Sequence, residues 1–220
     1  MSNKYDLRTV RLSACLAISF LALAACSPAG VIVGGAASAG VAASEERGIK
    51  GAANDTLIRV KINEAWMRAD FDAFSRLNLQ IYEGRVLVSG RVPDQTQADK
   101  AVQAAWKPEG VREVINEIEI SENSGLKGFA NDTLINAQLD ADLLFDGNVN
   151  SINYSTRAVG GTVYLLGVAR DRDELDRVFR IARDIPNVKR VISHVIMRED
   201  PRRIARPDGG MNSAKPADGR

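Results

Sequence analysis

Few residues of this chain have the type and spacing that catalysis requires. The only histidine is His194, and beyond Cys15 and Cys26 there is no cysteine that could act as a nucleophile. The densest carboxylate cluster falls at a predicted helix start, where acidic side chains cap exposed amides and complement the helix dipole. It comprises Asp171, Asp173, Glu174 and Asp176. We therefore expect no enzymatic activity and no cofactor.

Metal, phosphate and nucleic-acid sites are equally poorly supported. The acidic cluster lacks the glycine and the distal glutamate of a calcium-binding loop. The segment from Gly48 to Gly51 contains Lys50, but it lacks the Gly-Lys-Ser/Thr of a phosphate-binding loop. A net charge of +1 argues against general attraction to nucleic acid. We expect no metal site, no nucleic-acid partner and no small-molecule substrate.

Cys26 is the residue best placed for covalent chemistry. Residues 1–25 contain a positive stretch, an apolar run up to Leu23 and a small pair, which indicates a signal peptide too short to span a membrane. The sequence Leu23-Ala24-Ala25-Cys26 resembles the lipobox of bacterial lipoproteins, which implies acylation of Cys26 after cleavage. Ser27 then implies outer-membrane delivery, on the periplasmic face. The alternative is an ordinary signal peptide followed by an incidental cysteine.

Both ends of the chain are predicted to lie outside the folded part. Residues 26–47 are mostly Ala, Gly, Ser and Val, which favours a flexible tether. Alternatively, the apolar segment from Val31 to Val33 could belong to a weakly membrane-seeking helix. Residues 200–220 are rich in Pro, Gly and Arg without periodicity, which predicts a disordered tail.

The part between these ends is an internal repeat. Residues 48–58 read GIKGAANDTLI and residues 125–135 read GLKGFANDTLI, an offset of 77 residues (125 − 48). The same offset continues without a gap and pairs Gly84 with Gly161 and Gly90 with Gly167. We therefore predict two copies of one domain, at residues 48–122 and 125–199.

Each copy predicts an α+β fold with the order αββαβ. In the first copy, Asn54 or Asp55 could cap a helix that ends near Arg68, and alternating apolar residues around a Glu83-Gly84 turn predict a hairpin. Asp94 begins a second helix, and a strand closes the copy. The second copy predicts helices at 131–144 and 171–183 and strands at 149–154, 162–167 and 188–197. Two helices on one face of a three-stranded sheet would give each copy one core.

The hairpins and closing strands resemble those of the BON domain family. That family has a hairpin of the form Gly-x-Val-x-Leu/Val-x-Gly and a closing segment of the form Gly-Val-x-x-Val. The matching residues are Gly84, Val86, Val88, Gly90, Gly110, Val111 and Val114, then Gly161, Val163, Leu165, Gly167, Val188 and Val191, with Asn187 in place of the last glycine. The resemblance covers residues 48–199. It implies contact with phospholipid at a membrane surface and a role in envelope integrity.

By the same resemblance, anionic phospholipid would contact the first helix of the second copy. The transferred contacts are Leu134, Leu143, Leu144 and Phe145. Alternatively, Leu134, Leu139, Leu143 and Phe145 simply pack on the sheet. The helix also carries four aspartates, which repel anionic lipid: Asp132, Asp140, Asp142 and Asp146.

Basic residues of the next helix, among them Arg177 and Arg180, offer a second lipid contact, because each cation near a charged leaflet contributes about 1 kcal/mol. Alternatively, they form a solvated face paired with acids. A different class of function is a protein-binding scaffold for the machinery that assembles outer-membrane proteins, acting through strand addition at exposed sheet edges.

Overall fold

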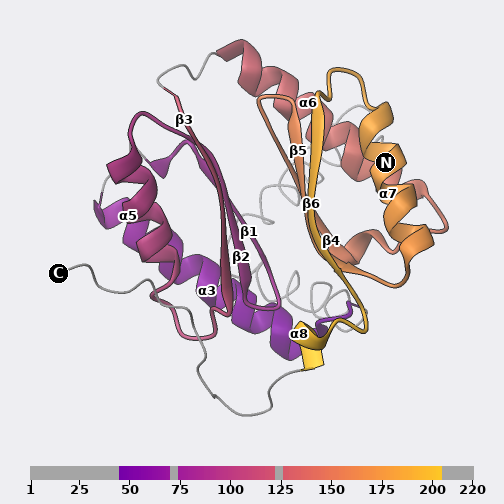
Figure 1. Cartoon of the computed structure of the whole chain (residues 1–220), viewed down its shortest axis with the longest axis horizontal. Coiled ribbons are helices and arrows are strands. Elements are labelled where there is room, and N and C mark those ends of the chain that lie inside the picture. Colours follow the sequence, from indigo (N-terminus) through magenta and orange to yellow (C-terminus); the bar gives the residue numbers. More distant parts are fainter. Residues whose placement is uncertain (1–44, 70–73, 122–125, 205–220) are drawn as a thin grey trace, which may run out of the picture. The chain divides into compact units, whose positions relative to one another are not determined.

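A computed structural model of the protein describes residues 45–69, 74–121 and 126–204 (Figure 1). The predicted signal peptide, Cys26 and the tether before residue 45 lie outside the described residues, as does the chain from residue 205 onward. Both copies of the repeat belong to one compact unit that begins at Glu45.

Each copy has the predicted order of elements. The first module contains α3 (Gly48–Ala69), β1 (Leu77–Tyr82), β2 (Arg85–Val92), α5 (Gln95–Ala105) and β3 (Glu113–Ile120). The second module contains α6 (Leu126–Phe145), the short helix η2 (Ser151–Asn153), β4 (Tyr154–Val159), β5 (Thr162–Ala169), α7 (Arg172–Asp184) and β6 (Arg190–Met197). A short helix, α8 (Pro201–Ile204), follows. The αββαβ prediction is confirmed in both modules.

The two sheets have the same topology and register. In the first, β1 is antiparallel to β2, and β2 is parallel to β3, so that β2 is central. The second sheet repeats this arrangement with β5 in the centre. The predicted turn at Glu83 and Gly84 is confirmed, and both residues have positive φ, 53° and 71°, as a two-residue hairpin of this twist requires. A Cβ atom at Gly84 would lie 2.3 Å from the carbonyl oxygen of Gly110, so only glycine fits there.

Each module has the core that was predicted for it. In the first, Ile58, Ile62 and Trp66 of α3 pack on Val86 and Val88 of the central strand. The second core repeats the arrangement with residues of α6, α7, β4 and β5: Ile135, Leu139, Leu143, Ala158, Val163, Leu165 and Val178. Figure 1 shows α3 and α5 on one face of the first sheet, and α6 and α7 on one face of the second. These cores set the direction in which each helix points its remaining side chains.

A carboxylate near the start of the first helix of each module holds that helix to its hairpin. Asp55 is 3% exposed and accepts hydrogen bonds from the backbone N–H groups of Glu83 and Gly84, both at 2.8 Å. In the second module, Asp132 accepts the N–H groups of Gly160 and Gly161 at 2.7 and 2.9 Å. The prediction that Asn54 or Asp55 caps the helix is wrong, because α3 begins at Gly48. Asp55 instead clamps the turn from inside the helix.

The sheet faces that point away from the helices are buried together in a third core. Tyr82 and Leu87 of the first sheet lie in one cluster with Tyr164, Leu166 and other apolar residues of the second. The amide Nε2 of Gln80 on β1 also donates to the carbonyl oxygen of Ser155 on β4 at 2.7 Å. The expectation of one core for each two-layer module was therefore incomplete, because both faces of each sheet are covered.

Several predicted boundaries differ from the structure. The helix predicted at 131–144 begins earlier, at Leu126. The strand predicted at 149–154 begins only at Tyr154, because Ser151–Asn153 form η2. The predicted disordered tail is wrong for Pro201–Ile204, which form α8. The cause is electrostatic: Arg203 of α8 pairs with Glu83 of the first module at 2.7 Å, and both side chains are largely buried.

Candidate lipid-contact surface

The outward face of α6 is unusually apolar. Four large side chains of this helix are mostly exposed to solvent: Phe129 (76%), Leu134 (71%), Leu144 (65%) and Phe145 (85%). The alternative of packing on the sheet is therefore wrong for Leu134 and Phe145, and Leu144 is exposed as well. Exposed apolar side chains along the length of a helix are typical of a surface that contacts a protein or a membrane.

Leu143 does not belong to this surface. It is 2% exposed and packs in the second core with Ile135 and Leu139, which precede it at intervals of four residues on the same helix face. The predicted lipid contact of Leu143 is therefore corrected: its side chain supports the helix from below. Leu144 and Phe145 occupy the outward positions beside it.

The aspartates of α6 have different surroundings. Asp132 is used in the hairpin clamp, and Asp140 accepts a hydrogen bond from the hydroxyl of Thr156 at 2.6 Å. Asp142 is exposed. Two of the predicted negative charges on this helix therefore accept hydrogen bonds from the second sheet and its hairpin. From Gly128 onward, α6 has no exposed cation that would balance them.

The two arginines predicted to contact lipid have different roles in α7. Arg177 donates to both carboxylate oxygens of Asp146, at 2.8 and 2.7 Å, and so joins α7 to the residue that follows α6. The N–H of Asn148 and the guanidinium of Arg177 hold the pKa of Asp146 below its usual value. The alternative of pairing with an acid therefore holds for Arg177. Arg180 is exposed.

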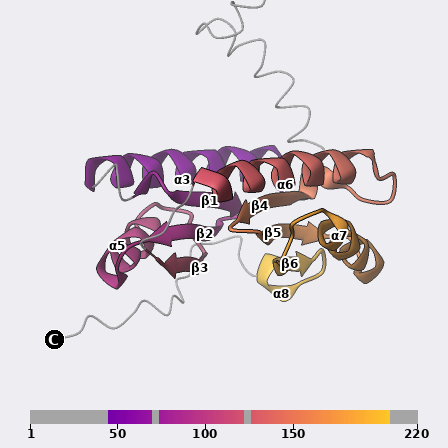
Figure 2. The ribbon, with the colours of Figure 1, turned by 90° about the horizontal axis from the view of Figure 1, so that it is seen from above.

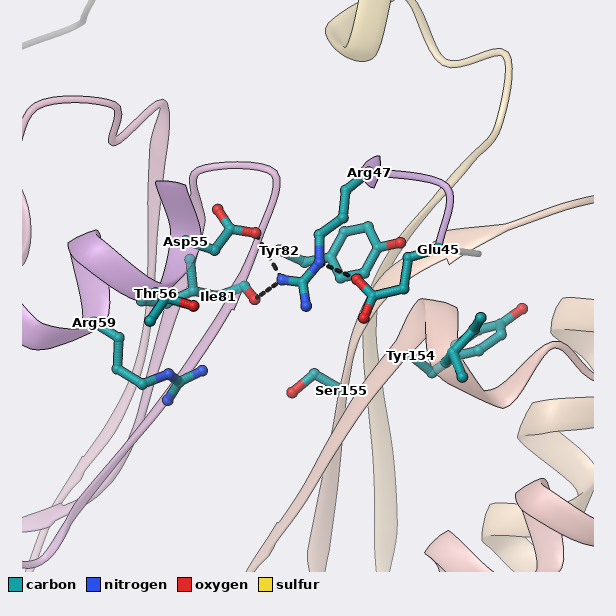
Figure 3. A pocket seen from close by; sticks show the side chains of 10 residues that line it. Glu45, Arg47, Asp55, Thr56, Arg59, Ile81, Tyr82, Tyr154 and Ser155 are labelled. Atoms are coloured by element: carbon teal, nitrogen blue, oxygen red, sulfur yellow. Dashed lines mark hydrogen bonds and ion pairs between the residues drawn. The ribbon is translucent and has the colours of Figure 1, made fainter. Parts of the chain in front are cut away.

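A polar pocket of about 280 Å³ lies between α3 and β4 (Figure 3). Arg47 occupies it, pairing with Glu45 and donating to Asp55 at 2.8 Å, with its guanidinium 4.9 Å from the ring centroid of Tyr82. Burial, followed by the charge of Glu45, raises the pKa of Tyr82 well above its ordinary value. The residues that line this pocket include no histidine or cysteine.

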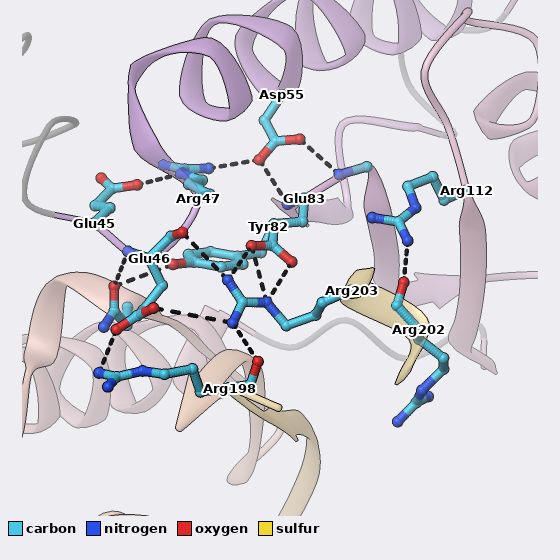
Figure 4. A network of polar contacts seen from close by, with 12 residues as sticks. Glu45, Glu46, Arg47, Asp55, Tyr82, Glu83, Arg112, Arg198, Arg202 and Arg203 are labelled. Atoms are coloured by element: carbon cyan, nitrogen blue, oxygen red, sulfur yellow. Dashed lines mark hydrogen bonds and ion pairs between the residues drawn. The ribbon is translucent and has the colours of Figure 1, made fainter. Parts of the chain in front are cut away.

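Beside this pocket, a network of ion pairs joins the residues just before α3 and just after β6 to the first hairpin (Figure 4). Arg203 donates to Glu83 and to the backbone carbonyl of Glu46, the latter at 3.2 Å, while Arg198 pairs with the Glu46 carboxylate. These contacts link the residue pair before α3, the first hairpin and α8, so the network stabilises their arrangement.

Two carboxylates of the acidic cluster at 171–176 accept backbone N–H groups at the start of α7. Asp171 caps α7 by accepting the N–H of Glu174 at 2.8 Å, and Glu174, 2% exposed, accepts the N–H groups of Asn150 and Arg170, each at 2.7 Å. Among the described residues, no group of three or more metal-ligating side chains is found. In the same part of the chain, no helix is long and apolar enough to cross a membrane.

Comparison with known proteins agrees with the fold and the repeat. The BON domain family matches this chain twice, at residues 54–122 and 131–199. The chain belongs to the BON family. The matches fall on the two modules described above, so each module is one BON domain, and the predicted tandem arrangement is confirmed.

Several relatives align with well over half of this chain. An uncharacterised protein in the gshII 5' region of Anaplasma centrale is 37% identical over 66% of this chain and 95% of its own length. The outer membrane lipoprotein DolP of Haemophilus influenzae is 30% identical, over 73% of this chain and 83% of its own. The osmotically inducible protein Y of Escherichia coli is 29% identical over 63% and 70% of the two chains. The chain therefore resembles DolP along most of its length.

Proposed function

We propose that this protein is a non-enzymatic, lipid-anchored protein of the outer membrane that binds anionic phospholipid through its BON domains and supports the integrity of the envelope. Acylation of Cys26 would hold it at the periplasmic face. The observation that carries the proposal is the apolar outward face of α6, with Phe145 85% exposed.

The geometry of α6 suits an interfacial helix. Its buried residues pack on the second sheet, and its outward residues Leu134, Leu144 and Phe145 are free to enter the boundary between headgroups and acyl chains. Two neighbouring apolar side chains at the end of the helix would anchor it, because burying each contributes about 1.5–3 kcal/mol.

The first residues of the chain and the relatives support the location. The sequence Leu23-Ala24-Ala25-Cys26 has the lipobox pattern, and a relative that shares most of this chain is named as an outer membrane lipoprotein. Acyl chains on Cys26 would keep both BON domains near the bilayer. The high local concentration of lipid would then keep even a low-affinity lipid-binding site largely occupied.

The proposal is tested by vesicle sedimentation of the chain without residues 1–25 and with Cys26 replaced by serine, which cannot be acylated. We expect sedimentation with vesicles that contain phosphatidylglycerol and much less with phosphatidylcholine alone. The double variant Leu144→Ser, Phe145→Ser should weaken binding about tenfold or more, with an unchanged circular dichroism spectrum.

A matched control is Ile120→Ser, which changes another exposed apolar side chain, 48% exposed, at the end of β3. It should bind as the unaltered chain does. If the unacylated chain without these surface substitutions sediments with no vesicle at any salt concentration, direct lipid binding is excluded.

The second candidate function is that of a protein-binding scaffold for outer-membrane assembly. The observation that favours it is the sheet order, which leaves β3 and β6 each paired with a single strand of its own sheet. A partner strand could add to either edge. This function predicts that removing the anchor abolishes all vesicle binding and leaves binding to the partner intact.

A further inference from the structure

The outward face of α3 combines apolar and basic side chains in two parallel rows. Ile49, Val60 and Met67 are all more than half exposed and lie eleven and seven residues apart (60 − 49 and 67 − 60). Because a helix turns by about 100° per residue, these spacings place them in one row. The next residue after each of them is Lys50, Lys61 and Arg68, all exposed, which form a second row beside the first.

The positive charges of α3 are largely available to an outside partner. The helix has one exposed carboxylate, Glu64, which pairs with Arg68 at 2.6 Å. Both side chains of that pair are mostly solvated, at 78% and 51% exposed, so the pair is weak. The other acidic residue of α3, Asp55, is buried in the hairpin clamp. The exposed face of this helix is therefore basic.

A fourth cation extends this charge toward the second module. Arg59 is exposed and donates from Nη1 to the carbonyl oxygen of Leu79 at 2.6 Å, which orients its guanidinium. Partial removal from water, followed by the nearby charges of Arg47 and Arg157, lowers the pKa of Arg59.

The equivalent helix of the second module carries fewer cations, although Lys127 corresponds to Lys50. At the offset of 77 residues, Arg59 corresponds to Asn136, Lys61 to Gln138, and Arg68 to Phe145. The corresponding positions of α6 have therefore lost three cations and gained an aromatic ring. Asp140 and Asp142 occupy positions where α3 has Asn63 and Ala65.

The two helices lie on the same side of the unit that contains both modules. Figure 2 shows α3 and α6 along one side, with α5, α7 and α8 toward the other. This placement agrees with the hydrogen bond from Gln80 to Ser155, which joins β1 beneath α3 to β4 beneath α6. One flat partner could therefore touch both helices at once.

We propose that α3 of the first BON domain provides the recognition of anionic phospholipid, while α6 of the second provides the apolar anchor. The inference rests on the proposed function and names which helix meets the charge. Lys50, Lys61 and Arg68 would lie against the headgroup phosphates, with their alkyl chains along the apolar row. This division explains how a protein with an acidic α6 binds a negatively charged surface.

The test compares two triple variants that remove equal charge. In the first, Lys50, Lys61 and Arg68 of α3 are replaced by glutamine; in the second, the exposed Arg172, Arg180 and Arg183 of α7 are replaced. Sedimentation of the unacylated chain with phosphatidylglycerol vesicles is measured at low and high salt. We expect the α3 variant to bind about 100-fold more weakly at low salt and to lose the salt dependence, whereas the α7 variant binds nearly as the unaltered chain does.

The outcomes separate the two proposals. If the unaltered chain binds and the α3 variant binds equally well, the role of α3 is excluded while the proposed function stands. If the α7 variant loses as much affinity as the α3 variant, a specific role of α3 is also excluded, because the net charge of the protein would then account for binding. If the unaltered chain does not bind, the proposed function itself fails. Circular dichroism checks that both variants remain folded.

Discussion

His194 and Glu117 lie in contact across the two modules, with Nε2 of the histidine 2.8 Å from Oε1 of the glutamate. The two residues occupy the same position of the repeat, since 194 − 117 is 77. A residue meets its own counterpart only where an approximate two-fold axis passes between the copies. Leu87 and Tyr164, which are also counterparts, lie together in the third core. The two BON domains therefore associate as an internal pseudo-dimer.

This contact gives a prediction for a charge swap. In the variant His194→Glu, two carboxylates would face each other, and we expect a loss of about 1 kcal/mol in the free energy of unfolding at pH 7. Adding Glu117→His restores an acid and imidazole pair in the reverse order and should recover most of the loss. Urea unfolding measures both. Equal stability of the single and double variants would contradict the pairing.

The clamp at the hairpin predicts a larger effect. Asp55→Ala leaves the N–H groups of Glu83 and Gly84 without their acceptor, so we expect a loss of about 2–4 kcal/mol. Asp132→Ala should cost a similar amount in the second module. The exposed Asp99→Ala provides the control, expected within about 0.5 kcal/mol of the unaltered protein. Unfolding curves in urea compare the three, and a neutral Asp55 variant would contradict the clamp.

Glycine substitutions test the close approach of backbone in the second module. Gly167 has φ of +149°, and a Cβ atom there would lie 2.0 Å from the carbonyl oxygen of Asn153. Gly167→Ala should therefore destabilise by about 2 kcal/mol or more. Gly147 has open space around it, so Gly147→Ala is expected to be close to neutral. Thermal unfolding distinguishes them, and equal melting temperatures would contradict the register of β4 and β5.

The third core predicts that the domains are stabilised together. Leu87 is 0% exposed and packs against the second sheet, so Leu87→Ala should cost about 2–5 kcal/mol. Because the cavity opens between the modules, amide hydrogen exchange should accelerate in both β2 and β5. The exposed Leu57→Ala is the control. Faster exchange confined to the first module would show that the domains are independent.

The order of elements could be predicted from the sequence because the repeat shows each pattern twice. The packing of the two sheets was missed, although Val86, Leu87 and Val88 form a continuous apolar run. Alternation indicates a strand buried on one face, whereas such a run indicates burial on both. The clamp could not be predicted from the sequence. An aspartate near a helix start gives the same sequence pattern whether its side chain caps the helix or accepts hydrogen bonds from a distant turn.

The candidate site was partly predictable. The apolar excess at the end of α6 was recognised, but the spacing from Leu139 to Leu143 assigns Leu143 to the core. Of the four predicted contacts, Leu134, Leu144 and Phe145 face outward. The basic face of α3 was missed, although aligning the two copies pairs Arg59 with Asn136 and so marks where charge differs. That comparison becomes informative once the structure shows which side chains are exposed.

The most direct test of the account measures which helices enter the bilayer. Residues 27–220 contain no cysteine, so single cysteines at Val60 on α3, Phe145 on α6 and Asp176 on α7 can carry an environment-sensitive fluorophore. With phosphatidylglycerol vesicles, we predict a blue shift for the labels on α3 and α6 and none for the label on α7. A shift at α7 alone, or at no position while the protein is bound, would contradict membrane contact through these two helices.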